Sequence, residues 1–558
     1  MIGIGLYQLL MKTGMGIWPS GMIAMVIMLQ YGMMTGGSVS AMRAVCMFLI
    51  SIGAKILGRI YDMMSALAGA AIMILLESPA YLYSSSFLLS FGAVIGIGAV
   101  APALERMAGV KGKLGKGLVS SFAVQITTLP VSLYFYGEVS VCGIFLNLIV
   151  LPTVGVVLGS GVAAVLLGCV NLYAGMVAAL PGRVLLRLYE WLCMLAGKLP
   201  VCTWIGGQPK MWQVGAYYGL LGLVLLILWL LEEQGSGKNG RQRPVWIGGK
   251  PGKPHQAWHK APEVTQPLLR FGCIAILGAG IAVLSYHPCL YLKITCLDVG
   301  QGDGIVVETP EKYCFLIDGG STNKSGVGQY QLLPYLKSQG ISYLDGIFIS
   351  HTDEDHISGV KELLSLMGEG LTSVRAGCLY LPDWSQPPEA WEELASLAEK
   401  AGVQVRSPKE GDRMDAGKLE IRFLAPAHDA VGTDVNEDGM VLTLRYGDFC
   451  GLFTGDIGEE TEKALLALGA LEDVDFLKAG HHGSHYSTCQ AFLDTVRPEY
   501  AVISCSSTNT YGHPSPETVE RLEGIGCRIG FTMKSGAVTV QTDGKHIGMK
   551  GFVTEQPD

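Results

Sequence analysis

Residues 350–356, Ser-His-Thr-Asp-Glu-Asp-His (SHTDEDH), decide the fold class of the second half of the chain. They follow the apolar stretch 344–349, which predicts a strand, and precede a helical pattern over 356–367. A loop at the carboxyl end of a strand is where α/β folds place their chemistry. This loop offers two imidazoles and three carboxylates, the nitrogen and oxygen donors that divalent metals use. A solvated loop can contain the same residues by chance, so the rest of the chain must show whether this loop belongs to a metal site.

Three further polar clusters also stand where an apolar strand is predicted to end. They are Asp318 in IDGG (317–320), Asp456 in FTGD (453–456) and the histidine pair in HHGS (481–484). Taken singly, Asp456 could cap a helix and His481 could be a core histidine. Four such clusters in this order indicate instead that they converge on one metal site.

The same half of the chain alternates between strand and helix patterns. Helices are predicted near 329–338, 356–367, 389–401, 459–468 and 515–524, and strands near 346–349, 440–445, 450–454, 500–504 and 528–532. This mixture over residues 291–558 predicts a two-sheet, helix-covered αββα sandwich.

The first half has a different composition. Hydrophobic residues make up 49% of the whole chain and charged residues only 16%, against about 25% charge in a soluble protein. The apolar excess lies in residues 1–231, which predicts a polytopic α-helical membrane bundle, because a span needs about 20 apolar residues. Spans are predicted near 14–35, 39–58, 63–82, 86–104, 118–136, 141–168, 170–198, 214–231 and 270–287.

Basic segments predict the topology of this bundle. A linker over 232–269 and the loop 106–116 are rich in Lys and Arg, and short loops of this kind stay in the cytoplasm. A final membrane helix within 270–290 would then carry the chain out, so the C-terminal domain is expected on the external face. The 14 cysteines form no CxxC pair, which argues against a disulfide framework and favours buried thiols. The net charge of -8 gives no overall basic field for nucleic acid.

Residues 291–558 resemble the metallo-β-lactamase fold superfamily, whose signature is His-x-His-x-Asp-His, a further His, a bridging Asp and a final His. The resemblance implies metal-assisted hydrolysis. It also implies that His351 binds one ion, that Asp355 and His356 bind the other, and that Asp456 bridges both.

The remaining histidines receive roles from the same resemblance. His482 would complete the second metal site with His481 close to the substrate, although either of these neighbours could be the ligand. Asp318 would orient the loop. The candidates for direct roles in hydrolysis are Asp355, His481, Lys478 and His513; His513 could equally be a surface-loop residue.

The sequence departs from the signature at two positions. Asp353 stands where the second His is expected, and the slot of the third His falls on Asn436, with His428 as the fallback. The full set of candidate metal ligands is His351, Asp353, Asp355, His356, Asp456 and His482. One or two divalent ions per chain are expected, and the oxygen-rich first site favours Mn²⁺ or Mg²⁺ over Zn²⁺.

Motifs in both halves resemble the ComEC family of DNA-internalisation proteins. They are ESPA (77–80), SFLLSFGAV (86–94), QITTLP (125–130), NLIVLP (147–152), DVGQGD (298–303) and HHGS (481–484). The resemblance implies import of single-stranded DNA through the cell membrane during natural transformation, with a metal-dependent nuclease that degrades the other strand. Its partners would be DNA, the lipid membrane, other DNA-uptake proteins and further copies of the chain. Family members usually carry more membrane sequence and a small OB-like domain upstream, which we expect this chain to lack.

Arg43 is the candidate for a pore-facing charge, because intramembrane charges tend to face a bundle interior. Two other functions stay open. One is a membrane-tethered phosphodiesterase or lactonase unrelated to DNA, and the other is a non-catalytic binding module that holds no metal in its first site.

Overall fold

The computed structural model describes residues 2–197, 199, 202–236 and 265–553. The chain forms two compact units, Met1–Tyr286 and His287–Asp558. The basic linker predicted over 232–269 falls largely outside the described residues.

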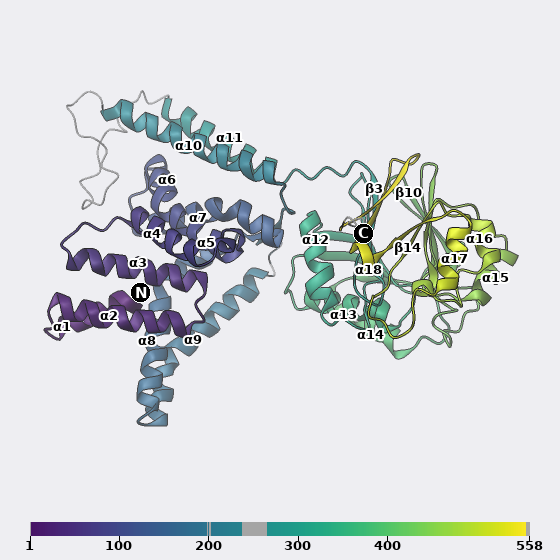
Figure 1. The fold of residues 1–558 in the computed structure, drawn as a ribbon, viewed down its shortest axis with the longest axis horizontal. Helices are drawn as coiled ribbons and strands as arrows, with labels where there is room; N and C mark the ends of the chain where they lie inside the picture. The colour runs from purple at the N-terminus through teal and green to yellow at the C-terminus, as the bar shows by residue number, and fades with distance from the viewer. Residues whose placement is uncertain (1, 198, 200–201, 237–264, 554–558) are drawn as a thin grey trace. The chain divides into compact units, whose positions relative to one another are not determined.

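The first unit is helical (Figure 1). Its helices are α1 (Ile2–Lys12), α2 (Ile17–Met34), α3 (Val39–Ile56), α4 (Met63–Glu77), η1 (Pro79–Tyr83), α5 (Ser85–Ile95), η2 (Gly96–Val100), α6 (Ala101–Ala108), α7 (Lys113–Tyr136), α8 (Gly143–Gly168), α9 (Leu172–Gly197), α10 (Met211–Ser236) and α11 (Thr265–Leu284). Within the described part of the chain, six helical stretches are long and apolar enough to cross a membrane: Ile17–Met34, Val39–Ile56, Ser85–Ala108, Lys113–Tyr136, Gly143–Gly168 and Met211–Leu230.

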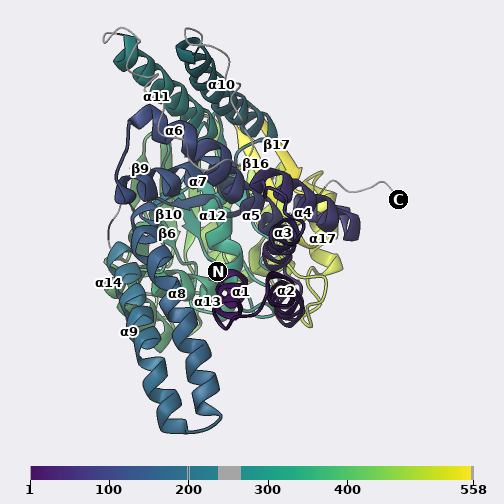
Figure 2. The same ribbon diagram turned by 90° about the vertical axis from the view of Figure 1, so that its left-hand side faces the viewer.

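Other predicted spans differ from the structure in length or charge. The helix expected over 63–82 ends at Glu77, because Pro79 cannot donate the next helical hydrogen bond. The stretch 170–198 does form a long helix, α9, but Arg183, Arg187 and Glu190 interrupt its apolar sequence. Prolines that could have broken α8 and α9 lie inside continuous helices, and Figure 2 shows the two helices side by side as a hairpin.

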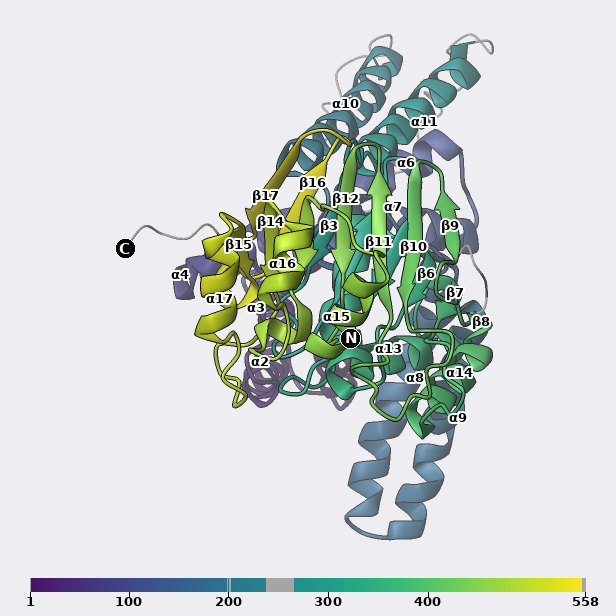
Figure 3. The ribbon, with the colours of Figure 1, turned by 90° about the vertical axis from the view of Figure 1, so that its right-hand side faces the viewer.

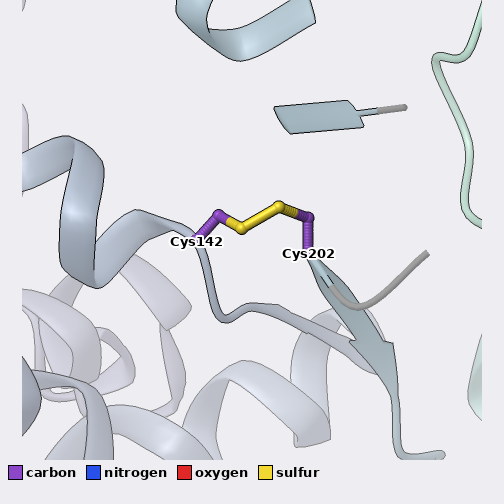
Figure 4. The surroundings of a disulfide bond; sticks show 2 residues. All are labelled: Cys142 and Cys202. Carbon is purple, nitrogen blue, oxygen red and sulfur yellow. A yellow bond between two sulfur atoms is a disulfide. The ribbon is translucent and has the colours of Figure 1, made fainter. Parts of the chain in front are cut away.

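A short ribbon and a disulfide tie the base of this hairpin together. Strand β1 (Glu138–Ser140) follows α7 and pairs antiparallel with β2 (Thr203–Ile205), which precedes α10. Next to the ribbon, Cys142 and Cys202 form a disulfide with their Cα atoms 4.9 Å apart (Figure 4). The expectation of free thiols is therefore wrong for this pair, and spacing in the sequence could not reveal it because 60 residues separate the two.

The second unit is a sandwich of two sheets. The eight-stranded sheet has the order β17 (Ile547–Gly551), β16 (Val538–Thr542), β3 (Leu292–Cys296), β4 (Ile305–Glu308), β5 (Cys314–Ile317), β6 (Tyr343–Phe348), β7 (Arg375–Tyr380) and β8 (Gln404–Arg406). The seven-stranded sheet has the order β15 (Arg528–Phe531), β14 (Tyr500–Ile503), β13 (Phe476–Lys478), β12 (Phe449–Phe453), β11 (Val441–Tyr446), β10 (Leu419–Ala425) and β9 (Arg413–Ala416).

Helices cover the outer faces of both sheets (Figures 1 and 3). They are η4 (Gly328–Leu332), α12 (Leu333–Gln339), α13 (Glu354–Gly368) and α14 (Glu389–Ala401) on one side, and α15 (Glu459–Ala467), α16 (Gln490–Val496) and α17 (Pro516–Gly524) on the other; the short α18 (Thr532–Ser535) follows β15. Alternate residues of the strands, such as Ile294, Phe348 and Phe476, meet in a buried core between the sheets. The predicted αββα architecture is confirmed.

Candidate metal centre

Strand ends from both sheets supply the polar residues of the site. Strands β5 and β6 run parallel in one sheet, and β12, β13 and β14 run parallel in the other. The carboxyl ends of parallel strands lie at the same edge of a sheet. Asp318 follows β5, His351 follows β6, and Asp456 follows β12. The chain thereby brings together residues that are far apart in sequence.

Four side chains form the centre of the cluster: Asp355, His356, Asp456 and His482, each with a ligand atom within 4.8 Å of the others. A carboxylate oxygen of Asp456 lies 3.3 Å from Nε2 of His356 and 3.4 Å from Nε2 of His482. Nε2 of His482 also lies 3.3 Å from Asp355. This is the set expected for the second metal site together with its bridging carboxylate.

A second group adjoins the first. His351, Asp353 and Asp355 also have ligand atoms within 4.8 Å of one another, so Asp355 is common to both groups. The Asp353 carboxylate lies 3.7 Å from Nε2 of His351 and is half-exposed, whereas His351 is buried. The group is richer in oxygen than a three-histidine site, which is the donor set that Mn²⁺ or Mg²⁺ prefers.

The orientation of the histidines fits a divalent ion. Each ring is anchored through Nδ1: His356 to Asp318 at 3.0 Å, His482 to the carbonyl oxygen of Ser504 at 3.0 Å, and His351 to the hydroxyl of Ser350 at 3.0 Å. Such outer contacts fix the tautomer that leaves Nε2 free to bind a metal. Buried atoms without a hydrogen-bond partner among the described residues include Nε2 of all three histidines and Oδ1 of Asp456. Since buried polar atoms are normally paired, these donors fit a cation.

Burial and charge shift the ionisation of these groups in opposite directions. Burial lowers the pKa of His351 to about 3, and the neighbouring His356 adds to the effect. Burial also opposes the charge on His356, but Asp456 and Asp318 raise its pKa well above the ordinary value. Burial would raise the pKa of Asp456, yet His482 and His356 hold it well below the ordinary range. Both Asp456 and Asp355, whose pKa falls to about 2, are therefore ionised at neutral pH.

The backbone around the cluster is unusual for non-glycine residues. Asp318, His481 and His482 have φ angles of 55°, 46° and 53°, in the left-handed region. Such conformations persist where the surrounding structure holds them, often at functional sites. A Cβ on Gly320 would lie 2.5 Å from the backbone nitrogen of His356, so the Asp318 loop can pack against the start of α13 only with glycine here.

The other predicted residues lie at different depths. His481 is one-third exposed, 4.0 Å from Asp456, and its ring centroid is 5.6 Å from that of His513. Burial, with His482 and His481 nearby, lowers the pKa of His513 to about 4. Lys478 is only 1% exposed and pairs with Asp303 at 2.8 Å.

Neither candidate for the third histidine slot belongs to the groups of ligand atoms found among the described residues. Asn436 is half-buried, and its side-chain oxygen has no hydrogen-bond partner there. His428 is exposed. In the first unit, Arg43 donates a hydrogen bond from Nη1 to the carbonyl oxygen of Ser90 at 3.0 Å.

Sequence reasoning gave no role to three residues that the structure places around the cluster. Ser350 contacts the Nδ1 atoms of both His351 and His356, at 3.0 and 3.2 Å, and Ser504 accepts from His482. Asp303 lies beneath the site with its Oδ1 3.8 Å from Nδ1 of His482. Asp303 ends the DVGQGD motif, which was the signal available for it.

Comparison with known families assigns both units. Residues 2–231 match the family described as Competence protein, and residues 297–507 match the Metallo-beta-lactamase superfamily. The chain joins a competence protein region to a metallo-β-lactamase domain. Curated proteins similar to this chain include ComE operon protein 3 of Bacillus subtilis, which is 24% identical over 552 residues, 96% of this chain and 65% of that protein.

A further curated relative matches part of this chain. Competence protein ComA of Neisseria gonorrhoeae is 28% identical over 246 residues, 44% of this chain and 31% of ComA. The chain thus spans less than two thirds of the length of either curated relative. Among solved structures, the metallo-β-lactamase fold protein YhfI of Bacillus subtilis is 13% identical, covering 43% of this chain and 96% of YhfI with a TM-score of 0.31.

Proposed function

We propose that this competence-type chain takes part in importing single-stranded DNA across the cytoplasmic membrane, and that its C-terminal domain is a metal-dependent nuclease for the strand that is not imported. The observation that carries the nuclease is the convergence of Asp355, His356, Asp456 and His482, in which Nε2 of both histidines and Oδ1 of Asp456 have no hydrogen-bond partner among the described residues. The competence region and the membrane-length helices support a role in transport.

The residues of the site have separate tasks in this proposal. Asp355, His356, Asp456 and His482 would hold one divalent ion, and His351 and Asp353 would hold a second together with Asp355, which both groups share. A bound ion would supply hydroxide near neutral pH and polarise a phosphoryl oxygen. Asp318, Ser350 and Ser504 keep the imidazoles aimed inward.

Two histidines at the rim would meet the phosphodiester. His481 is partly exposed beside Asp456, within reach of an incoming phosphate. His513, whose ring centroid is 5.6 Å from that of His481, would hydrogen-bond a phosphate oxygen. We assign protonation of the leaving oxygen to His481, because it is one-third exposed and lies 4.0 Å from Asp456.

Two independent features support an external C-terminal domain. Helix α7 begins at the basic 106–116 loop, which favours the cytoplasm, and ends before the Cys142–Cys202 disulfide, which favours an oxidising compartment. At 24 residues, α7 is long enough to separate the two sides. Strand β2, on the disulfide side, leads into α10, and α11 follows. If α10 and α11 each cross the membrane once, the chain returns to the disulfide side, and the second unit begins there.

The nuclease is tested with the purified full chain in detergent. Labelled single-stranded DNA should be cleaved with Mn²⁺ or Mg²⁺, should stay intact in excess chelator, and should stay intact with the Asp456→Asn variant. Asp494→Asn changes an exposed carboxylate on α16 and serves as the matched control. If the DNA stays intact while a small phosphodiester or lactone is hydrolysed in a metal-dependent reaction, the domain is a membrane-tethered hydrolase of another kind and not a nuclease.

A further inference from the structure

A fully buried ion pair connects the two sheets directly beneath the metal centre. Lys478 is the last residue of β13 in the seven-stranded sheet, and Asp303 lies two residues before the start of β4 in the eight-stranded sheet. The ammonium nitrogen lies 2.8 Å from Oδ2 of Asp303, and each side chain is only 1% exposed. With Asp318 and Ser350, the two residues line a cavity of about 10 Å³ between the sheets.

Asp303 forms hydrogen bonds with the part of the site that the eight-stranded sheet supplies. Its backbone N–H donates to the carbonyl oxygen of Asp355 at 3.0 Å, and its own carbonyl oxygen accepts from Gly320 at 2.9 Å. The residue therefore fixes the start of α13, which carries Asp355 and His356, relative to the Asp318 loop.

Lys478 forms hydrogen bonds with the part of the site that the seven-stranded sheet supplies. Its Nζ donates to the carbonyl oxygen of Ala479 at 3.0 Å, at the entrance to the loop that carries His481 and His482. The hydroxyl of Thr454, next to the Asp456 loop, donates to the carbonyl oxygen of Lys478 at 3.2 Å. Among the described residues, the ammonium group contacts the carboxylate of Asp303 and the carbonyl oxygen of Ala479, and it is buried.

We propose that Lys478 and Asp303 act together as positioning residues that hold the two halves of the metal centre in register, and that Lys478 takes no direct part in hydrolysis. Separating two halves of a site by a small distance weakens metal binding, because the ligand geometry is exacting. A charged pair suits this task, since leaving either charge buried alone is strongly unfavourable and the two side chains must stay together. The inference rests on the proposed metal site but not on the identity of the substrate.

The test measures metal affinity and thermal unfolding of the full chain in detergent, without DNA. Lys478→Met and Asp303→Asn should each lower the unfolding temperature in chelator and weaken Mn²⁺ binding at least about tenfold. The double variant leaves no uncompensated buried charge, so its unfolding temperature in chelator should recover toward that of the wild type. Its Mn²⁺ affinity should stay at least about tenfold weaker, because the link between the sheets is gone.

The Lys293–Glu308 pair supplies the control. It joins β3 and β4 at the same 2.8 Å but lies within one sheet, so Lys293→Met combined with Glu308→Gln should leave Mn²⁺ affinity unchanged. Wild-type Mn²⁺ affinity in the Lys478/Asp303 double variant would overturn the proposal. Normal Mn²⁺ binding by the wild type without DNA cleavage would instead overturn only the proposed nuclease.

Discussion

Nε2 of His356 lies 3.3 Å from the carboxylate of Asp456, although His356 follows a strand of one sheet and Asp456 a strand of the other. The candidate metal centre therefore lies where the two sheets meet. Occupancy of the site should then be linked to the stability of the whole sandwich, because an ion that binds only the folded state stabilises it.

Chelation and the Asp456→Ala variant test this linkage. The free energy of unfolding of the second unit should increase when Mn²⁺ is added, by about 2.7 kcal/mol at a free ion concentration 100 times the Kd. Asp456→Ala should remove most of this rise and abolish metal-dependent DNA cleavage. Calorimetry of the full chain with and without chelator measures the shift, and an unchanged rise in the variant would take Asp456 out of the site.

Asp318→Asn tests the outer contacts of the histidines. Asp318 accepts from the backbone N–H of Ser350 at 2.7 Å and contacts Nδ1 of His356 at 3.0 Å. We expect Mn²⁺ affinity to fall about 10- to 100-fold, as is usual when an outer partner of a metal ligand is lost. Isothermal titration measures the affinity, and a value equal to that of the wild type would show that His356 needs no such anchor.

Gly320→Ala tests the close packing under the site. The added methyl group would lie 2.5 Å from the carbonyl carbon of Asp355 and from the nitrogen of His356, so α13 must move. We expect a loss of stability of a few kcal/mol, of the order seen for overpacked cores, together with weaker metal binding. Gly548→Ala, where a Cβ meets nothing within 4 Å, should change neither quantity.

His513 predicts a pH dependence of stability. Its pKa of about 4 in the folded protein lies below the ordinary value of 6.5. As the pH falls from 6.5 toward 4, the unfolded chain takes up a proton that the folded chain does not, so stability falls. In chelator, the unfolding temperature of the wild type should therefore fall more than that of His513→Gln as the pH decreases over this range. A difference that stays constant from pH 7 to pH 4.5 would contradict the shift.

Thiol labelling in whole cells tests the topology. After free thiols are blocked and the cells are reduced, a membrane-impermeant maleimide should label Cys142 and Cys202 from outside. Lys111→Cys, in the basic loop before α7, should react with this reagent only after permeabilisation. Label on the cysteine pair that appears only in permeabilised cells would place the disulfide on the cytoplasmic side.

The sequence was informative where local patterns carry the fold. Apolar strands that stop at Asp318, His351, Asp456 and His482 predicted the sandwich, because strand periodicity is a local property. The same pattern named side chains that the structure brings close together. The apolar runs also located the six helical stretches that are long and apolar enough to cross a membrane among the described residues.

Properties that depend on distant neighbours could not be predicted. Lys478 ends an apolar strand shortly before two histidines, so the sequence alone suggested a reactive group. In the structure it pairs with Asp303, which lies just before a strand of the other sheet. The pairing of Cys142 with Cys202 likewise depends on the ribbon between β1 and β2. Whether Asn436, at the position of the third histidine, can reach the metal ligands depends on where its loop lies in the folded chain.

The Cys142–Cys202 bond also gives α8 and α9 a mechanical property. Together with the backbone between them, it makes a covalent ring, so the two ends of the hairpin cannot be pulled apart by force along the chain. A protease that nicked the turn after Gly168 would leave both pieces attached through sulfur, and they would migrate separately on a gel only after reduction.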